Sequence, residues 1–352
     1  PQGEGGGEGS PVDAIELYNP TGADIVLDGW WLSDTADDFF KFQIPAGTTI
    51  PAYGYVTFYE GHYVGPTFTV DETNEFGGTG VKDFALSSSR GDDVWLLADF
   101  GEGSSLRFAD HVEFGAARLH ETFGRWPNGS GKLYPMQNNT LGEPNDGPRI
   151  GPLIFSEIHY NPSDAANADD LEYVEIYNPR GTEVVLTDWR IRGGIDFNFA
   201  EGTTIGAMSS LVVLPFDPAD VDNNAALLSD FLTKYTIDAS AAMVGGYTGR
   251  LNNAGGTVRL QRPDASPPDD LTFIPRLLED EVTYDVIAPW PPEANGQDFS
   301  LNRLGVQLWG HDPTSWTAGV PTPGTAELDA GAEVVGRHVF YNNSDFDGND
   351  PA

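Results

Sequence analysis

The sequence predicts an all-β protein that consists of two β-sandwiches in tandem, with a short helical insertion in the second. The first observation is an internal repeat: residues 172–189 restate residues 13–30, so that Asn178 and Trp189 follow Asn19 and Trp30 at the same offset of 159 residues. A repeat of this length is a whole domain that occurs twice, and not a solenoid unit of about 20 to 50 residues. The second observation is composition. The 352 residues include 42 glycines and 26 prolines and are 39% hydrophobic, which indicates folded domains rich in turns and not intrinsic disorder.

Short strands separated by turn residues are expected throughout the first copy. Apolar and polar residues alternate around Ile15 and Leu17 and again from Ile25 to Trp31, and residues 19–22 between the two runs have turn composition. We predict that the two runs form a half-buried antiparallel hairpin. Further strands are expected at residues 53–59, 94–97 and 112–114, at spacings typical of a sandwich.

The second copy repeats these strands at residues 211–214, 258–260 and 282–284, but it also contains a segment of a different kind. In residues 224–235, apolar side chains recur at helical spacing, and Asp222 and Asn223 before them can cap a helix. The sequence therefore predicts a short helix near 224–235 that is inserted in the second sandwich.

These assignments place the first domain at residues 1–146, the second at 147–330 and a tail at 331–352. An apolar lead strand, residues 153–161, precedes the second copy, and no equivalent of it stands before the first copy in this sequence. The tail segment 333–345 resembles the lead strand, since residues 338–342 (His-Val-Phe-Tyr-Asn) are similar to residues 158–161 (Ile-His-Tyr-Asn). The first sandwich is thus expected to lack a strand that the tail carries.

Net charge and cysteine content limit the partners of the protein. With 18 basic and 54 acidic residues the formal net charge is −36, which disfavours binding to nucleic acid and to anionic membrane surfaces. The absence of cysteine excludes disulfides. No apolar run is long enough to predict insertion into a membrane. A cysteine-free β protein rich in glycine, threonine and asparagine is typical of bacterial surface proteins, so an extracellular location is expected.

Several segments of the first copy together resemble the lamin tail domain, an immunoglobulin-like β-sandwich of nuclear lamins and of many secreted bacterial and archaeal proteins. They are Glu16-Leu17-Tyr18-Asn19 with Leu27 and Trp30, residues 45–50, Leu86-Ser87-Ser88 through Val94, residues 124–129 and the closing Gly142-Glu143-Pro144-Asn145. The second copy keeps the early segments, including residues 156–162, but only residues 300–303 of the later ones. The resemblance implies two immunoglobulin-like sandwiches with architectural motifs and no catalytic residues.

The residues themselves give no sign of an enzyme. The six histidines, at positions 62, 111, 120, 159, 311 and 338, have no metal-binding spacing, and Gly129-Ser130-Gly131-Lys132 departs from a phosphate-binding loop. Glu16 and Glu175 recur in the repeat and could serve a glycosidase. Because they recur at one place in both copies, a structural hydrogen-bonding role is the favoured interpretation.

Calcium is the cofactor that the sequence favours most, because it binds several carboxylate and carbonyl oxygens in irregular loops. The candidate ligands are Asp345, Asp347 and Asn349 in the tail and Asp217, Asp220 and Asp222 before the predicted helix. Two further acidic groups are Asp34, Asp37 and Asp38, and Asp164, Asp169 and Asp170. Each of these groups can equally be a solvated turn.

Two functions remain open at this stage. The first is a non-catalytic extracellular structural or adhesive protein, in the form of a filament or appendage subunit. Its copies would join head to tail when the tail strand of one chain completes the first sandwich of the next. The expected contact residues are Val334, Val335, His338, Phe340 and Tyr341. The same pattern arises if these residues are part of a longer chain, whose own preceding strand completes the first copy and whose tail begins a third domain.

The second function is a pair of accessory modules of a larger secreted enzyme, which bind protein or polysaccharide. In that case aromatic side chains would be presented to glycans, and the candidates are Trp31, Trp126, Trp290 and Trp309.

Overall fold

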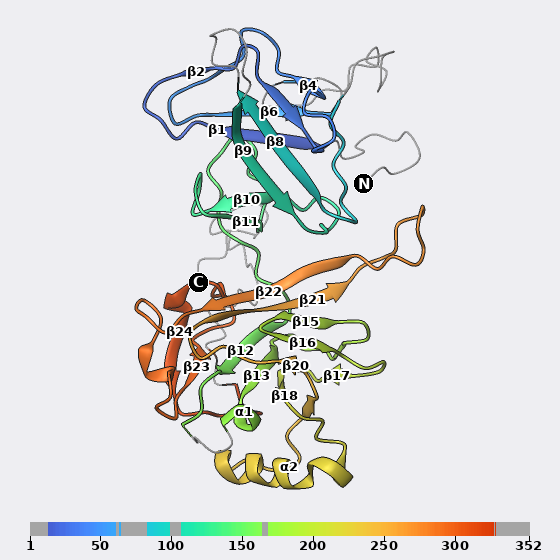
Figure 1. Cartoon of the computed structure of the whole chain (residues 1–352), viewed down its shortest axis with the longest axis vertical. Helices are drawn as coiled ribbons and strands as arrows, with labels where there is room; N and C mark the ends of the chain where they lie inside the picture. Colours follow the sequence, from blue (N-terminus) through green and yellow to red (C-terminus); the bar gives the residue numbers. More distant parts are fainter. Residues whose placement is uncertain are drawn as a thin grey trace, which may run out of the picture.

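The computed structural model describes residues 13–60, 63–64, 83–98, 107–163, 168–326 and 328. They form two β-sandwiches that are stacked along the long axis of the molecule, the first copy above the second in Figure 1. The predicted all-β class and the tandem arrangement are confirmed. Within the described residues, no helix is both long enough and apolar enough to cross a membrane.

The first sandwich contains two sheets and two short strand pairs. One sheet has the order β1-β6-β7 and the other the order β4-β3-β8-β9, while β2 pairs with β5 and β10 with β11. In chain order the strands are β1 Ala14–Tyr18, β2 Ile25–Val26, β3 Trp31–Ser33, β4 Phe42–Gln43, β5 Thr49–Ile50, β6 Tyr55–Tyr59, β7 Tyr63–Val64, β8 Asp92–Ala98, β9 Arg107–Phe114, β10 Phe123–Trp126 and β11 Lys132–Pro135. Leu27, Leu32, Phe42 and Phe58 fill the core between the sheets.

The second sandwich has larger sheets, with the orders β19-β18-β13-β12-β23-β24 and β20-β16-β15-β21-β22, and a short pair β14-β17. Its strands are β12 Ile154–His159, β13 Tyr173–Asn178, β14 Val184–Val185, β15 Arg190–Gly193, β16 Ile195–Asn198, β17 Thr204–Ile205, β18 Ser209–Leu214, β19 Met243–Gly245, β20 Thr248–Gly249, β21 Gly256–Pro263, β22 Arg276–Tyr284, β23 Ser300–Arg303 and β24 Trp316–Gly319. Short 3-10 turns cover Pro292–Ala294 and Pro313–Ser315. Trp189 lies in its core, as expected for the tryptophan of the repeat.

The predicted hairpin between residues 15–17 and 25–31 is wrong. Strand β1 pairs with β6, and β2 pairs with β5. The reason lies in the turn, because the side chain of Asn19 is fully buried and donates hydrogen bonds to the carbonyls of Ala23, at 2.8 Å, and Ile50, at 3.1 Å. The turn thereby directs the chain away from β1 and toward β5.

The predicted helix is present but starts earlier. Helix α2 spans Val221–Tyr235, and its N-cap is Asp220, whose carboxylate accepts a hydrogen bond from the backbone N–H of Asn223. Asp222 and Asn223, the expected caps, lie inside the first turn. A second helix, α1 Ala168–Leu171, is too short to leave a periodic pattern. Phe231 of α2 packs against Tyr173 and Val212, so α2 covers the outer face of the six-stranded sheet.

A cluster of charged residues joins the two sandwiches at the end where β22 faces the first copy (Figure 1). The side chain of Glu279, on β22, is fully buried and lies within 3.4 Å of Arg118, Arg149 and Arg262. Arg118 belongs to the first copy, and Arg149 also pairs with Glu121 at 2.7 Å. Tyr134 and Trp309 pack edge to face beside this cluster, with ring centroids 4.9 Å apart. The two domains are therefore connected by side-chain contacts as well as by the chain.

Candidate functional site

The motif that recurs in the two copies is architectural. Asn19 and Asn178 are both fully buried, and each donates from its side-chain nitrogen to three backbone carbonyls. For Asn178 these are the carbonyls of Thr182, Ile205 and Gly206, at 2.8 to 3.2 Å. One amide thus holds three chain segments in each sandwich, so its recurrence reflects folding and not catalysis.

The recurrent glutamates also have a structural role, as predicted. Glu16 accepts a hydrogen bond from the backbone N–H of Gly142 at 2.5 Å, and Glu175 accepts one from the N–H of Gly324 at 2.6 Å. In each copy the carboxylate therefore ties the closing turn to the first sheet. Burial raises the pKa of Glu16, and the N–H donor of Gly142 opposes this shift. Because the two carboxylates act in separate sandwiches, they are not a glycosidase pair.

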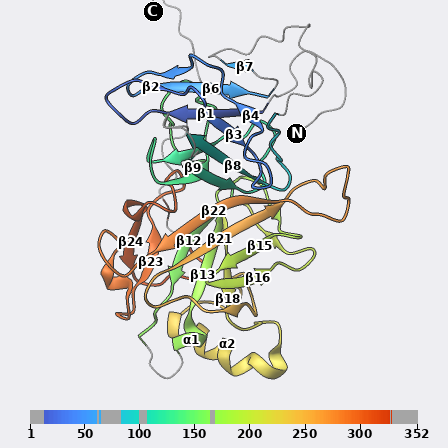
Figure 2. The same cartoon turned by 45° about the horizontal axis from the view of Figure 1, so that its top comes forward.

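The lead strand β12 lies inside the large sheet of the second sandwich, between β13 and β23 (Figure 2). It runs antiparallel to both neighbours, with Ile158 opposite Val174 on β13 and Leu301 on β23. Ser156 donates to the carboxylate of Glu175 at 2.6 Å, and Phe155, Ile158 and Tyr160 enter the core. The lead strand is therefore the element that unites β13 and β23 in one sheet.

The corresponding place in the first sandwich is unfilled by any strand of the described residues. Strand β1, the counterpart of β13, forms the end of its sheet, and β10, the counterpart of β23, pairs only with β11. The backbone N–H of Asn19 donates a hydrogen bond to the carbonyl of Gly54, and the backbone carbonyl of Asp13 accepts one from the N–H of Glu60. Since antiparallel pairing alternates along a strand, the backbone groups of Ala14, Glu16 and Tyr18 face away from β6. They form an edge that can accept a strand.

The loop after β10 holds this strand close to the β1-β6 sheet. Asn128 donates from its side chain to the hydroxyl of Tyr55 at 2.9 Å, and Gly129 lies so close to the ring of Tyr18 that a Cβ atom there would overlap it. On the outer edge of β10, the carbonyl of Arg125 is already occupied by the side chain of Asn145, at 3.0 Å. Phe123 is the other β10 residue whose backbone faces away from β11. In the second sandwich β12 likewise pairs with β23 over only two residues, Leu301 and Asn302.

Burial of the core differs in the same place. In the second sandwich Ile176, Val258, Leu260 and Val282 are fully buried, and Tyr284 is 2% exposed. The residues at the equivalent positions of the first sandwich are only half-buried: Leu17, Val94, Leu96, Val112 and Phe114. These five side chains line the part of the core against which the lead strand packs in the second copy. The first core is therefore less deeply buried on the side where no described strand takes the place of β12.

Of the predicted calcium ligands, the structure describes Asp217, Asp220 and Asp222, which are not among the described residues whose ligand atoms lie close enough together to hold a metal ion. Asp217 accepts a hydrogen bond from the backbone N–H of Ala219 at 2.9 Å, and Asp220 caps α2, while Asp222 lies in its first turn. Asp34 pairs with Lys41, and Asp169 pairs with Arg250. Asp345, Asp347 and Asn349 lie outside the described residues, as do Asp164 and the expected contact residues Val334, Val335, His338, Phe340 and Tyr341.

A different acidic group was missed from the sequence. Asp93, His111 and Glu113 approach one another across the β8-β9 pair, and their ligand atoms lie within 4.8 Å. His111 stacks on Trp95, with ring centroids 3.7 Å apart, and its Nε2 lies 3.3 Å from Asp93. The group forms because the register of β8 and β9 places Asp93 opposite Glu113 and His111 opposite Trp95. All three side chains are accessible to solvent, so the group is an ordinary surface cluster.

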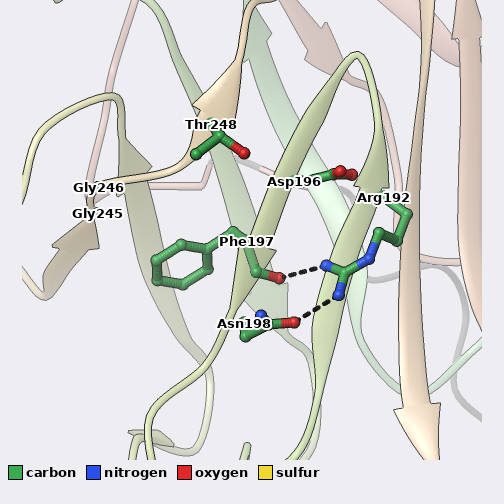
Figure 3. Close-up of a pocket in the computed structure, with 7 residues that line it drawn as sticks. All are labelled: Arg192, Asp196, Phe197, Asn198, Gly245, Gly246 and Thr248. Atoms are coloured by element: carbon green, nitrogen blue, oxygen red, sulfur yellow. Dashed lines mark hydrogen bonds between the residues drawn. The ribbon is translucent and has the colours of Figure 1, made fainter.

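A hollow of the second sandwich, about 500 Å³ in volume, lies between the β15-β16 hairpin and the loop from β19 to β20 (Figure 3). Arg192 is the cation in it, and its guanidinium already donates to the carbonyls of Ile191 and Phe197 and to the side chain of Asn198, at 2.6 to 3.1 Å. The other lining residues are Asp196, Gly245, Gly246 and Thr248. Since its cation holds backbone together, the hollow shows no constellation for acid–base or nucleophilic chemistry.

The four tryptophans considered for glycan binding are packed against protein. Trp290 is 6% exposed, and Trp31, Trp126 and Trp309 are half-buried. Trp309 contacts Tyr134 at the junction of the domains. These four residues therefore do not form an exposed aromatic row.

Comparisons with known proteins agree with the repeat. The model of the lamin tail domain family matches residues 2–111 and 148–265, more than half of the chain. The lamin tail domain is a non-enzymatic immunoglobulin-like domain. Among solved structures, a DUF4876 family protein from Bacteroides thetaiotaomicron is similar at 12% sequence identity and a TM-score of 0.31, over 87% of this chain and 92% of that chain. No curated protein matches. One matched region covers the first sandwich as far as β9, and the other covers the second sandwich as far as β21, and the chain therefore belongs to the lamin tail domain family.

Proposed function

We propose that this chain is a non-catalytic structural or adhesive protein of the extracellular surface, and that its first sandwich accepts a β-strand from a second molecule of the same protein. The observation that carries the proposal is that, among the described residues, no strand lies between β1 and β10, where the second sandwich has β12. An exposed strand edge offers unpaired N–H and carbonyl groups in a row, and a strand from another chain satisfies them with main-chain hydrogen bonds. The half-buried core residues beside this edge add apolar surface for the incoming strand to cover.

The geometry of such an interface favours a filament. A strand given by one copy and accepted by another makes a head-to-tail contact between two different surfaces, and a contact of this kind forms open polymers unless its rotation closes a ring. The buried cluster around Glu279 supports a role as a filament subunit, because it couples the two sandwiches within each molecule. An acidic, cysteine-free composition is compatible with a secreted polymer.

Electron microscopy and sedimentation of the purified full chain, with variants at Ala14, test the proposal. The N–H of Ala14 faces the open edge, and proline is tolerated on an edge strand where its nitrogen faces outward. Ala14→Pro should therefore leave the β1-β6 pair intact and abolish filaments. Ala14→Ser keeps the N–H and should assemble like the unaltered protein.

Monomers of the unaltered chain that unfold with a normal transition of the first sandwich would overturn the proposal. If such monomers bound a glycan array, the accessory-module function would be favoured instead. The extracellular location is tested separately by protease treatment of intact producing cells, which should remove the protein without lysis.

A further inference from the structure

The place between β1 and β10 has a chemistry that selects its occupant. We infer that the occupant is segment 333–345 of a second molecule of the protein. This segment runs antiparallel to β1 in the register that β12 has against β13. This inference rests on the proposed function and names the strand that the first sandwich accepts.

The strongest support is the sequence of the segment. Residues 341–345 are Tyr-Asn-Asn-Ser-Asp, and residues 160–164 at the end of the lead strand are Tyr-Asn-Pro-Ser-Asp. The match fixes a single alignment, in which Val334 corresponds to Leu153, Val339 to Ile158 and Tyr341 to Tyr160. All three lead-strand residues are fully buried in the core of the second sandwich. The segment thus supplies apolar side chains at three of the positions that the core requires.

The alignment also predicts the cross-strand pairs with β1. In the second sandwich Ile158 lies opposite Val174, Glu157 opposite Glu175, and His159 opposite Tyr173. Transferred to the first sandwich, Val339 lies opposite Ile15, His338 opposite Glu16, and Phe340 opposite Ala14. The large Phe340 thus meets the small Ala14, where the second sandwich pairs a histidine with a tyrosine.

His338 and Glu16 can carry opposite charges, whereas the equivalent pair in the second sandwich, Glu157 and Glu175, cannot. There, two carboxylates face each other at this position, and the charge of Glu175 is one of the factors that raise the pKa of Glu157. A histidine opposite Glu16 replaces that repulsion with a hydrogen bond or ion pair. Among the described residues, the other groups near Glu16 are Thr57, the N–H of Gly142, and Tyr55 and Tyr59 on β6.

Tyr341 would meet an aromatic residue in the acceptor. Tyr160 stacks on Tyr284 in the second sandwich, with ring centroids 4.7 Å apart. The equivalent of Tyr284 in the first sandwich is Phe114, which is half-buried and packs against Phe123 at 5.2 Å. The position of Phe155 is taken by Gly336, which supplies no side chain, so the apolar contribution of the strand is concentrated in residues 339–341.

Disulfide trapping between two different chains tests the register directly, because the protein has no cysteine of its own. Full-length Ala14→Cys and Phe340→Cys proteins are purified separately, mixed and oxidised, and the linked peptides are identified by mass spectrometry. Antiparallel partners have Cα atoms about 4.5 to 5.5 Å apart, within the range of a disulfide. We expect the peptide that joins residues 14 and 340. The control, Val339→Cys mixed with Ala14→Cys, should give about tenfold less product, because neighbouring side chains point to opposite faces of a strand.

The outcomes separate this inference from the proposed function. Filaments in which residue 14 links to 339 and not to 340 would overturn the register, and filaments that give neither product would overturn segment 333–345 as the occupant. In both cases the proposed function stands. A double Ala14→Cys/Phe340→Cys variant that closes only within one chain, with no product in the mixed sample, would overturn the second copy as the source of the strand. Absence of filaments altogether would remove the proposed function itself.

Discussion

The two sandwiches share their turns and differ in the completeness of their sheets. Asn19 and Asn178 make the same set of hydrogen bonds, and Glu16 and Glu175 bind the same closing turn. Yet every residue of β13 is buried, whereas in β1 only Ile15 is. The difference follows from the lead strand and helix α2, which cover β13 on its edge and its outer face. A short motif therefore fixes the path of the chain, while burial depends on elements far outside the motif.

The largest expected effect comes from deleting the same apolar side chain in both copies. Ile176→Ala empties a fully buried site, so the free energy of unfolding of the second sandwich should fall by about 2 to 5 kcal/mol. Leu17→Ala at the equivalent, half-buried site should cost about half as much, since less apolar surface is lost from the folded state. Both are measured by calorimetry in the Ala14→Pro background, which keeps the first sandwich unassembled.

Equal costs of the two substitutions would contradict the difference in burial between the two cores. If Leu17→Ala and Ile176→Ala cost the same in that background, the first core is complete without an added strand. In assembled protein with Ala14 intact, by contrast, the cost of Leu17→Ala should rise, because the backbone of the incoming strand covers Leu17. It should stay below the cost of Ile176→Ala, since Gly336 stands where Phe155 lies opposite Ile176 in the second sandwich.

The next effect is confined to the second sandwich and depends on pH. Burial raises the pKa of Glu157 from 4.5 to about 7, although Ser300 and Tyr173 hydrogen-bond its carboxylate. Between pH 4.5 and 7 the folded state therefore holds a proton that the unfolded chain releases. The free energy of unfolding should fall as the pH rises through this window and level off above it, a change on the order of 3 kcal/mol.

Glu157→Gln isolates this contribution. The variant keeps an acceptor for the hydroxyl of Tyr173 but cannot titrate, so the difference between it and the unaltered protein should grow from pH 5 to pH 8. Part of the pH dependence should remain, because burial also raises the pKa of Glu172 to about 7. Glu183→Gln, at an exposed position, is the matched control and should reproduce the unaltered profile. A difference that is the same at both pH values would contradict the assignment to Glu157.

How much the sequence could predict follows from the range of each interaction. The repeat and the alternation of apolar and polar residues predict the fold class, the two domains and the longer strands, because turns and alternation are local. The hairpin of β1 with β2 was predicted wrongly, since the bonds from Asn19 to Ile50 and Pro51 join residues more than 30 positions apart. The start of α2 was misplaced because Asp220, Asp222 and Asn223 can all cap a helix. The sequence predicts that the first sandwich lacks a lead strand, and this corresponds to the strand edge at Ala14, Glu16 and Tyr18. It does not predict that Val94 and Phe114 beside this edge are only half-buried, because burial depends on packing.

The smallest effect should be the same in both sandwiches. Asn19→Ala and Asn178→Ala each remove a buried amide and leave three carbonyls without that donor, which should lower the free energy of unfolding by about 2 kcal/mol in either copy. Asn19→Asp and Asn178→Asp are matched variants that keep the size of the side chain and the acceptor for the N–H of Thr21 or Arg180 but lose the donor. They should cost at least as much, because a carboxylate would face carbonyl oxygens. Separate calorimetric transitions of the two domains report each cost. Equal losses of free energy would show that the turn is independent of the lead strand. A markedly larger loss in the second sandwich would mean that β12 stabilises the turn. In that case the path of the chain would depend on the distant strand as well as on the local motif.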